Sequence, residues 1–146
     1  MTKERFCQGT QRTPQIGDVY LVHFDGTGSV QAGLRPAVVF QNNAGNLHSP
    51  NVVVLPLTTS LKKREMPTHV FVEAGATGLL KDSLVLCENP QCIPKENLGR
   101  YLTTLSDEHM AKIAQGSLLA SSAISFLDLE SVVNLWRQAH RLNAVS

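Results

Sequence analysis

Short apolar runs separated by glycine, proline and asparagine are the feature that most constrains how this chain can fold. They are rich in β-branched and aromatic residues and lie at 19–24, 36–41, 52–57, 70–73, 83–87 and 101–102. The spacers between them, such as 25–29 and 42–46, are typical of turns and loops. Pro56 indicates an edge or a bulge near the end of the third run. Many short strands without intervening helices predict a small antiparallel barrel or sandwich.

Helices are expected only after the last of these runs. Ser106 can cap a helix whose first turn holds Asp107 and Glu108, because carboxylates there stabilise the positive end of the helix dipole. The apolar stripe that should lie on the barrel consists of Met110, Ile113, Ala114 and Ser117. A second stripe at helical spacing, starting near Asp128, consists of Leu129, Val132, Val133, Trp136 and Ala139. This second stripe needs a partner surface.

Length, charge and cysteine content restrict the class of protein. With 146 residues the chain has the size of one domain, and its net charge of +1 argues against a protein that coats nucleic-acid duplexes through a global positive field. Its cysteines, Cys7, Cys87 and Cys92, form no CxxC pair and have no histidine at zinc-finger spacing. We therefore expect a reduced cytoplasmic protein without a metal site or cofactor. No apolar run approaches the ~18 residues of a membrane span, so no membrane partner is expected.

Two short polar segments stand out within this β-rich pattern. Arg35 precedes Pro36 at the exit of a long loop, and a residue before proline is held in an extended conformation. Thr58 ends the third apolar run and is followed by the basic run 62–64. An arginine and a threonine at strand ends can grip a phosphodiester without a metal ion, which favours RNA as the substrate class.

Seven short segments, read in order, resemble the MazF/PemK family. They are Gly17-Asp18-Val19, residues 31–39, Pro56-Leu57-Thr58, Pro67-Thr68-His69-Val70, residues 80–85, Leu98-Gly99 and residues 104–108. The resemblance covers roughly residues 17–118. It implies a mainly β (α+β) fold, a small SH3-like antiparallel β-barrel with C-terminal helices. It also implies a homodimer that cleaves single-stranded RNA at specific sequences and is neutralised by a cognate antitoxin protein.

The domain boundaries that we expect follow from this resemblance. Residues 1–16 would form a polar leader and 17–120 the barrel domain. Residues 121–146 would form a helical extension packed on the same domain, with its apolar stripe against the barrel or across the dimer.

The resemblance assigns the catalytic roles to Arg35 and Thr58. Cleavage without a metal uses the 2′-hydroxyl of RNA to attack the adjacent phosphate, and leaves a 2′,3′-cyclic phosphate and a 5′-hydroxyl. Arg35 would stabilise the charge that develops on the phosphate, a contribution typically worth about 10²–10³ in rate. Thr58 would position the phosphate or the nucleophile, because an isolated hydroxyl is a weak base.

Further residues are candidates for binding RNA. They are Gln31, Gly33, Thr59, Ser60, Lys62, Lys63, Met66 and Asn89. The lysines would contact phosphates, and the amide side chains would read the edges of unpaired bases. His69 is a conceivable base, but its place in a strand-entry motif of the family favours a structural or binding role.

The sequence departs from the family pattern at 88–93, where Pro90 is gained and an arginine is lost. Two other functions therefore remain open. One is a non-catalytic toxin of the same fold that inhibits DNA gyrase, as the related CcdB toxins do. The other is an RNA-binding regulator that does not cleave.

Overall fold

The computed structural model describes residues 12–26, 33–75 and 77–144. Its strands are β1 Asp18–Phe24, β2 Gly33–Val39, β3 Asn51–Thr58, β4 His69–Val72, β5 Ser83–Leu86, β6 Gln91–Pro94 and β7 Leu98–Thr104. Its α-helices are α2 Asn43–His48, α3 Asp107–Ser121 and α4 Leu129–Asn143. Two single-turn 3-10 helices are η1 Lys95–Asn97 and η2 Ala123–Phe126. No helix in these ranges is both long and apolar enough to cross a membrane.

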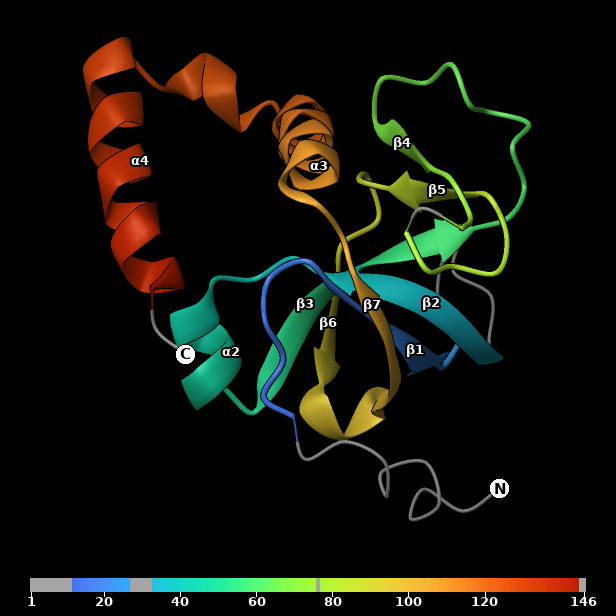
Figure 1. Ribbon diagram of the computed structural model, residues 1–146. Helices are drawn as coiled ribbons and strands as arrows, with labels where there is room; N and C mark the ends of the chain where they lie inside the picture. The colour runs from blue at the N-terminus through green and yellow to red at the C-terminus, as the bar shows by residue number, and fades with distance from the viewer. Residues whose placement is uncertain (1–11, 27–32, 76, 145–146) are drawn as a thin grey trace.

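The strands form one antiparallel sheet that curls on itself (Figure 1). Its order is β4-β5-β3-β2-β1-β7, and β6 pairs with the first half of β3. Hydrogen bonding does not close the sheet within the described residues, although η1 links β6 directly to β7. The prediction of a mainly β, barrel-like domain followed by helices is therefore confirmed.

Pro56 lies at a change of partner in the middle of the sheet and not at an edge. On one side of β3, residues 51–54 pair with β6 and residues 57–58 pair with β5. Phe40 donates its backbone N–H to the carbonyl of Val53, and hydrogen-bonded pairs alternate along an antiparallel ladder. The nitrogen of Pro56 therefore faces the gap between β6 and β5, where a missing N–H loses no ladder bond.

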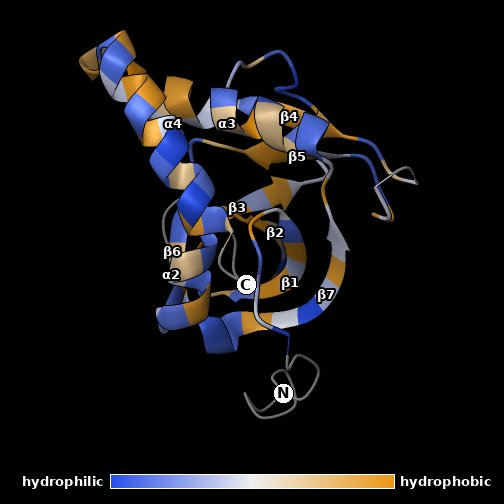
Figure 2. Cartoon of the chain, turned by 60° about the vertical axis from the view of Figure 1, so that its left-hand side comes forward, coloured by the Kyte–Doolittle hydropathy of each residue, from blue (hydrophilic) through white to orange (hydrophobic). Residues whose placement is uncertain are grey.

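Two cores occupy opposite faces of the sheet. The first fills the curl of the barrel and is built from Tyr20, Val22, Phe24, Ala37, Val39, Val52, Val54, Ile93 and Leu98. The second lies beneath α3 and includes Val19, Val38, Leu55, Leu57, Val85 and Ile113. The alternation of Ala37, Val38 and Val39 between the cores follows from the two-residue period of a strand. In Figure 2 much of the hydrophobic colour lies on the strands, whereas α3 and α4 are banded with both hydrophilic and hydrophobic residues.

Helix α3 begins and packs as its sequence predicts. The hydroxyl oxygen of Ser106 accepts the backbone N–H of His109 at 3.2 Å, and Ile113 is fully buried. Gly116 permits a close approach, because a Cβ there would lie 3.0 Å from Sγ of Cys87. This contact brings the middle of α3 onto the strand layer beside β4 and β5.

One α-helix and one strand were not predicted, and neither were the two 3-10 helices. Residues 42–46 were expected to form a turn, but Asn42 caps the short helix α2 by accepting the N–H of Gly45 at 2.8 Å. Asparagine favours turns and N-caps for the same reason, so the residue type could not distinguish them. The strand β6 was also missed. Its four residues follow Pro90 and end with Pro94, and they form a strand by pairing with β3.

Helix α4 starts at the predicted cap, Asp128, whose carboxylate accepts the N–H of Ser131 at 2.7 Å. Its last turn is tied to α2, because Asn43 donates to the backbone carbonyl of Asn143 at 3.0 Å. None of the residues of α4 is buried, and Trp136 is 62% exposed. The helix stands off the sheet (Figure 1) and, together with α3, borders an apolar groove of about 720 Å³.

Candidate functional site

Arg35 and Thr58 come from neighbouring strands. The register of β2 with β3 places Ala37 opposite Pro56, and continuing it by two residues brings Arg35 level with Thr58. Residues two positions beyond an opposed pair lie on the same face as that pair. Arg35 and Thr58 therefore share one face and one level of the sheet. Both residues are half-buried.

The ladder between β2 and β3 ends before it reaches these two residues. Arg35 is held from its other side by pairing with Val22 of β1, and Thr58 by pairing with Leu84 of β5. Val22 and Leu84 are buried. The site thus has a firm base, while the backbone between Arg35 and Thr58 is not closed by ladder bonds.

The hydroxyl of Thr58 also shapes the turn that follows β3. Its Oγ1 accepts the backbone N–H of Ser60 at 3.2 Å, which is the local bond that hydroxyl residues commonly make in turns. A hydroxyl group has one proton to donate and two lone pairs. Accepting this bond therefore leaves the proton of Thr58 available for an oxygen atom of a ligand.

The basic run lies on the loop 59–68, which joins β3 to β4. Lys62 and Lys63 are exposed there, whereas the guanidinium of Arg64 stacks 3.8 Å from the ring centre of Phe71. Phe71 is opposite Leu84, and Leu84 is opposite Thr58. With strands about 4.8 Å apart, Phe71 lies roughly 10 Å from Thr58. The guanidinium of Arg64 is therefore held over β4, two strands away from Thr58.

The same loop is fastened by a histidine contact that the sequence did not reveal. Nδ1 of His69 lies 2.8 Å from the carbonyl oxygen of Lys63, and Nε2 lies 2.7 Å from Oε1 of Glu88. Only 6% of the His69 side chain is exposed. Because protein groups occupy both ring nitrogens, the geometry favours the structural or binding role over that of a free base. The 19-residue separation of His69 from Glu88 gives no local sequence signal.

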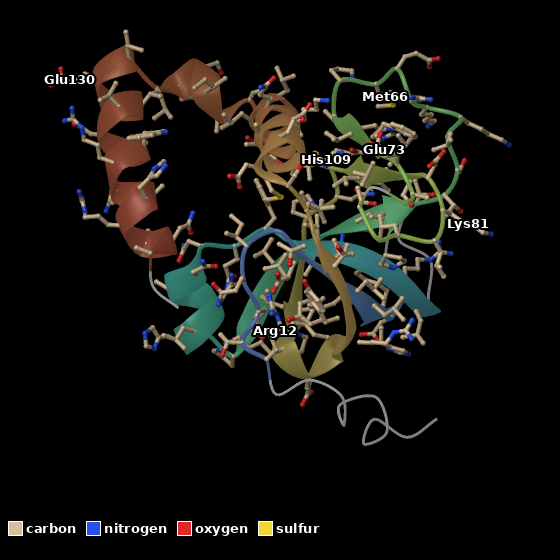
Figure 3. The ribbon with its side chains drawn as sticks, in the orientation of Figure 1. Arg12, Met66, Glu73, Lys81, His109 and Glu130 are labelled. Atoms are coloured by element: carbon tan, nitrogen blue, oxygen red, sulfur yellow. The ribbon has the colours of Figure 1, made fainter. Side chains whose placement is uncertain are left out.

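A cleft of about 500 Å³ lies beside this histidine, between β4 and α3. Its lining includes Arg64, His69, Glu73, Glu108, His109 and Lys112. Figure 3 shows Glu73 on the β4 side and His109 on the α3 side. Charges of both signs surround the ring of His69.

The other predicted RNA-binding residues are spread around this region. Gly33 begins β2 with a φ of +113°, a conformation that side chains rarely adopt, and among the described residues, its chain neighbours apart, no heavy atom lies within 4 Å of where a Cβ would be. Thr59 and Ser60 are exposed just after β3. Met66 is exposed on the loop 59–68 (Figure 3), and Asn89 is half-buried in the turn after β5. The predicted Gln31 lies outside the described residues.

Two buried groups have strongly raised pKa values. Burial raises the pKa of the Cys87 thiol to about 11, and burial together with the nearby Asp18 raises that of Tyr20 to about 12. Within the described ranges, no group of three or more His, Cys, Asp or Glu side chains is arranged to hold a metal ion.

Residues 15–118 match the family of PemK-like, MazF-like toxins of type II toxin-antitoxin systems. The chain belongs to this family. It is 37% identical over 111 residues to the endoribonuclease EndoA of Bacillus subtilis, which covers 75% of this chain and 96% of EndoA. It is 42% identical over 98 residues to the endoribonuclease MazF of Staphylococcus saprophyticus, which covers 66% of this chain and 82% of that protein.

Solved structures of PemK/MazF proteins share the fold. One is a mycobacterial endoribonuclease in complex with its cognate antitoxin, which matches with a TM-score of 0.63 and 30% identity. That match covers 75% of this chain and 96% of the other. The family match ends at residue 118, so η2 and α4 lie beyond the part of the chain that defines this PemK/MazF protein.

Proposed function

We propose that this PemK/MazF protein is a metal-independent, sequence-specific endoribonuclease that cleaves single-stranded RNA. The observation that carries the proposal is the register of β2 with β3, whose continuation by two residues brings Arg35 and Thr58 to one level and one face of the sheet. Its membership of a family with endoribonuclease relatives supports the same function. Exposed lysines on the neighbouring loop supply positive charge for the RNA backbone.

The proposed reaction needs little covalent chemistry from the protein. The 2′-hydroxyl of a ribose gives up its proton as its oxygen attacks the adjacent phosphorus. The bond from phosphorus to the 5′-oxygen breaks, and that oxygen takes up a proton and leaves as a 5′-hydroxyl. Arg35 contacts the phosphate oxygens, because its planar and permanently charged fork of donors suits them. Thr58 holds the phosphate in line through its hydroxyl proton.

In this proposal the chain acts as a homodimeric toxin in the cytoplasm and is neutralised by a cognate antitoxin. The mycobacterial relative has been solved with its own antitoxin. The large exposed apolar residues on α3, η2 and α4, among them Leu119, Phe126 and Trp136, provide surface of the kind that marks protein interfaces. A reduced compartment suits the free thiols of Cys87 and Cys92.

The test incubates pure protein with long single-stranded RNA in EDTA and maps the new 5′ ends. We expect cleavage at recurring sequences, a loss of about 10²-fold or more in rate for Arg35→Ala, and near-normal rates for Arg137→Ala. Arg137 is exposed on α4 and loses the same charge, which makes it a matched control. Equal cleavage by wild type and Arg35→Ala would refute the assignment. Binding without cleavage would instead favour an RNA-binding regulator.

Thr58 is tested by two substitutions that differ in the hydroxyl. Thr58→Ser keeps the hydroxyl and should retain most activity, whereas Thr58→Val keeps the shape and should lose it. Thermal melting of both variants controls for the bond to Ser60, which the valine variant also loses.

A further inference from the structure

His69 lies where two segments of the proposed RNA surface meet. Its ring joins the carbonyl of Lys63, in the basic loop, to the carboxylate of Glu88, in the turn that also carries Asn89. The Lys63 carbonyl also accepts the backbone N–H of Met66 at 3.2 Å. One ring therefore fixes the loop 59–68 relative to the turn after β5.

The two contacts specify the protonation of the ring. A backbone carbonyl and a carboxylate are both acceptors, so each ring nitrogen must carry a proton to form its bond. A neutral ring has one N–H and would direct a lone pair at one of the two oxygens. The geometry is therefore that of a doubly protonated imidazole, and its bond to Glu88 is charge-assisted.

The surroundings of the ring contain charges of both signs. Glu88 is the acid in direct contact, and Lys63 and Arg64 belong to the loop that the ring holds. Glu73 follows β4 on the same cleft, and α3 contributes Glu108, His109 and Lys112. His109 bonds with the hydroxyl of Ser106 at 2.9 Å, so it is a second titratable ring in the cleft that has a different partner.

We propose that His69 is a positioning residue for RNA, whose doubly protonated ring holds the basic loop and the Glu88–Asn89 turn in the arrangement that binds the substrate. This inference rests on the proposed endoribonuclease function. Both N–H groups are needed for this grip, because each faces an acceptor. Without the ring the loop is no longer held, and RNA binding weakens because Lys62 and Lys63 are no longer in place.

Glu88→Gln is the variant that separates this role from simple structural support. A glutamine amide offers an oxygen acceptor or an N–H donor, depending on its orientation. It therefore bonds either to a charged ring or to a neutral ring that still donates from Nδ1 to Lys63. The loop stays held in Glu88→Gln, whereas His69→Gln releases it.

The experiment measures KM and kcat for cleavage of a mapped single-stranded RNA at one pH. We expect the KM of His69→Gln to rise about fivefold while its kcat changes less than about twofold, because a charge-assisted bond is lost and Arg35 and Thr58 are not altered. The KM of Glu88→Gln should stay within about twofold of wild type. His109→Gln should follow wild type. A wild-type KM in His69→Gln, a fall in its kcat as large as the rise in its KM, or a KM of Glu88→Gln as high as that of His69→Gln would overturn the proposal.

A second measurement does not depend on catalysis. Ring ¹⁵N NMR of the free protein at pH 6 should show both nitrogens of His69 protonated, with one-bond coupling to hydrogen at each. A ring with one bare nitrogen would overturn the positioning role even if RNA were cleaved. If His69 shows both protons and no RNA is cleaved by any variant, the contact stands and the proposed function fails.

Discussion

The buried carboxylate of Asp18 offers a test of how the barrel is fastened to the segment before it. Asp18 is fully buried at the start of β1. Its oxygens accept bonds from Nε and Nη2 of Arg12 at 3.2 and 3.1 Å, and from the backbone N–H of Gln15 at 2.9 Å. The hydroxyl of Thr104, at the end of β7, donates to it at 2.7 Å. Arg12 also stacks on the ring of Tyr101.

The cost of Asp18→Ala can be worked out from these partners. Arg12 is 47% exposed, so water replaces much of what it loses, and its share is at most about 1 kcal/mol. The N–H of Gln15 and the hydroxyl of Thr104 lose a buried acceptor, at about 1–3 kcal/mol each. These contributions sum to about 2–7 kcal/mol. Removing one partner of a buried ion pair typically costs about 3–5 kcal/mol, so we expect a loss of that size in the free energy of unfolding, or roughly 10 °C in Tm for a chain of this size.

Urea denaturation followed by far-UV circular dichroism measures this loss, with all variants at one protein concentration. Arg12→Ala should cost about 1 kcal/mol, because Asp18 keeps its other donors. Asp25→Ala, at an exposed carboxylate, should stay within about 0.5 kcal/mol of wild type. The reasoning is wrong if Asp18→Ala unfolds within 1 kcal/mol of wild type, or if Arg12→Ala costs as much.

Two further predictions concern titratable groups. In a Cys7→Ser background, a thiol reagent at pH 8 should modify exposed Cys92 quickly and Cys87 slowly, because burial raises the pKa of Cys87 to about 11 and keeps it a thiol; equal rates would contradict this. The bonds from Ser131 lower the pKa of Asp128, so its cap on α4 is complete above the ordinary range of aspartate and is lost as pH falls through the lowered pKa. As pH falls through this lowered pKa, the helical signal in far-UV circular dichroism should decrease in wild type, and it should decrease less in Asp128→Ala.

The elements of the fold were largely predictable because their signals are local. The strands from β1 to β5 coincide with apolar runs, and the helices α3 and α4 begin after the predicted caps Ser106 and Asp128. Capping and side-chain periodicity depend on residues within one or two turns of each other, so they can be read along the chain. The prediction of a turn at Asn42 was wrong. An asparagine side chain makes the same short-range bond in a turn and in a helix N-cap, so this local signal fits both structures.

The candidate site was predictable only in part. The resemblance to a family selected Arg35 and Thr58, but their shared level follows from the register of β2 with β3. The contact of His69 with Glu88 was not predicted, because these residues are 19 positions apart in the chain. The stacking of Arg64 on Phe71 was not predicted either. The residue types at these positions do not indicate which side chain each will contact.

Sequence alone thus determined most of the segments that form strands and helices, and which residue types can bind and strain a phosphodiester. Only the tertiary structure decided which of them meet. It brought Thr104 to Asp18 across 86 positions, and it left the apolar stripe of α4 exposed beside a groove. The physical reason is that local structure reflects neighbours in the chain, whereas register and side-chain pairing reflect the joint packing of distant segments.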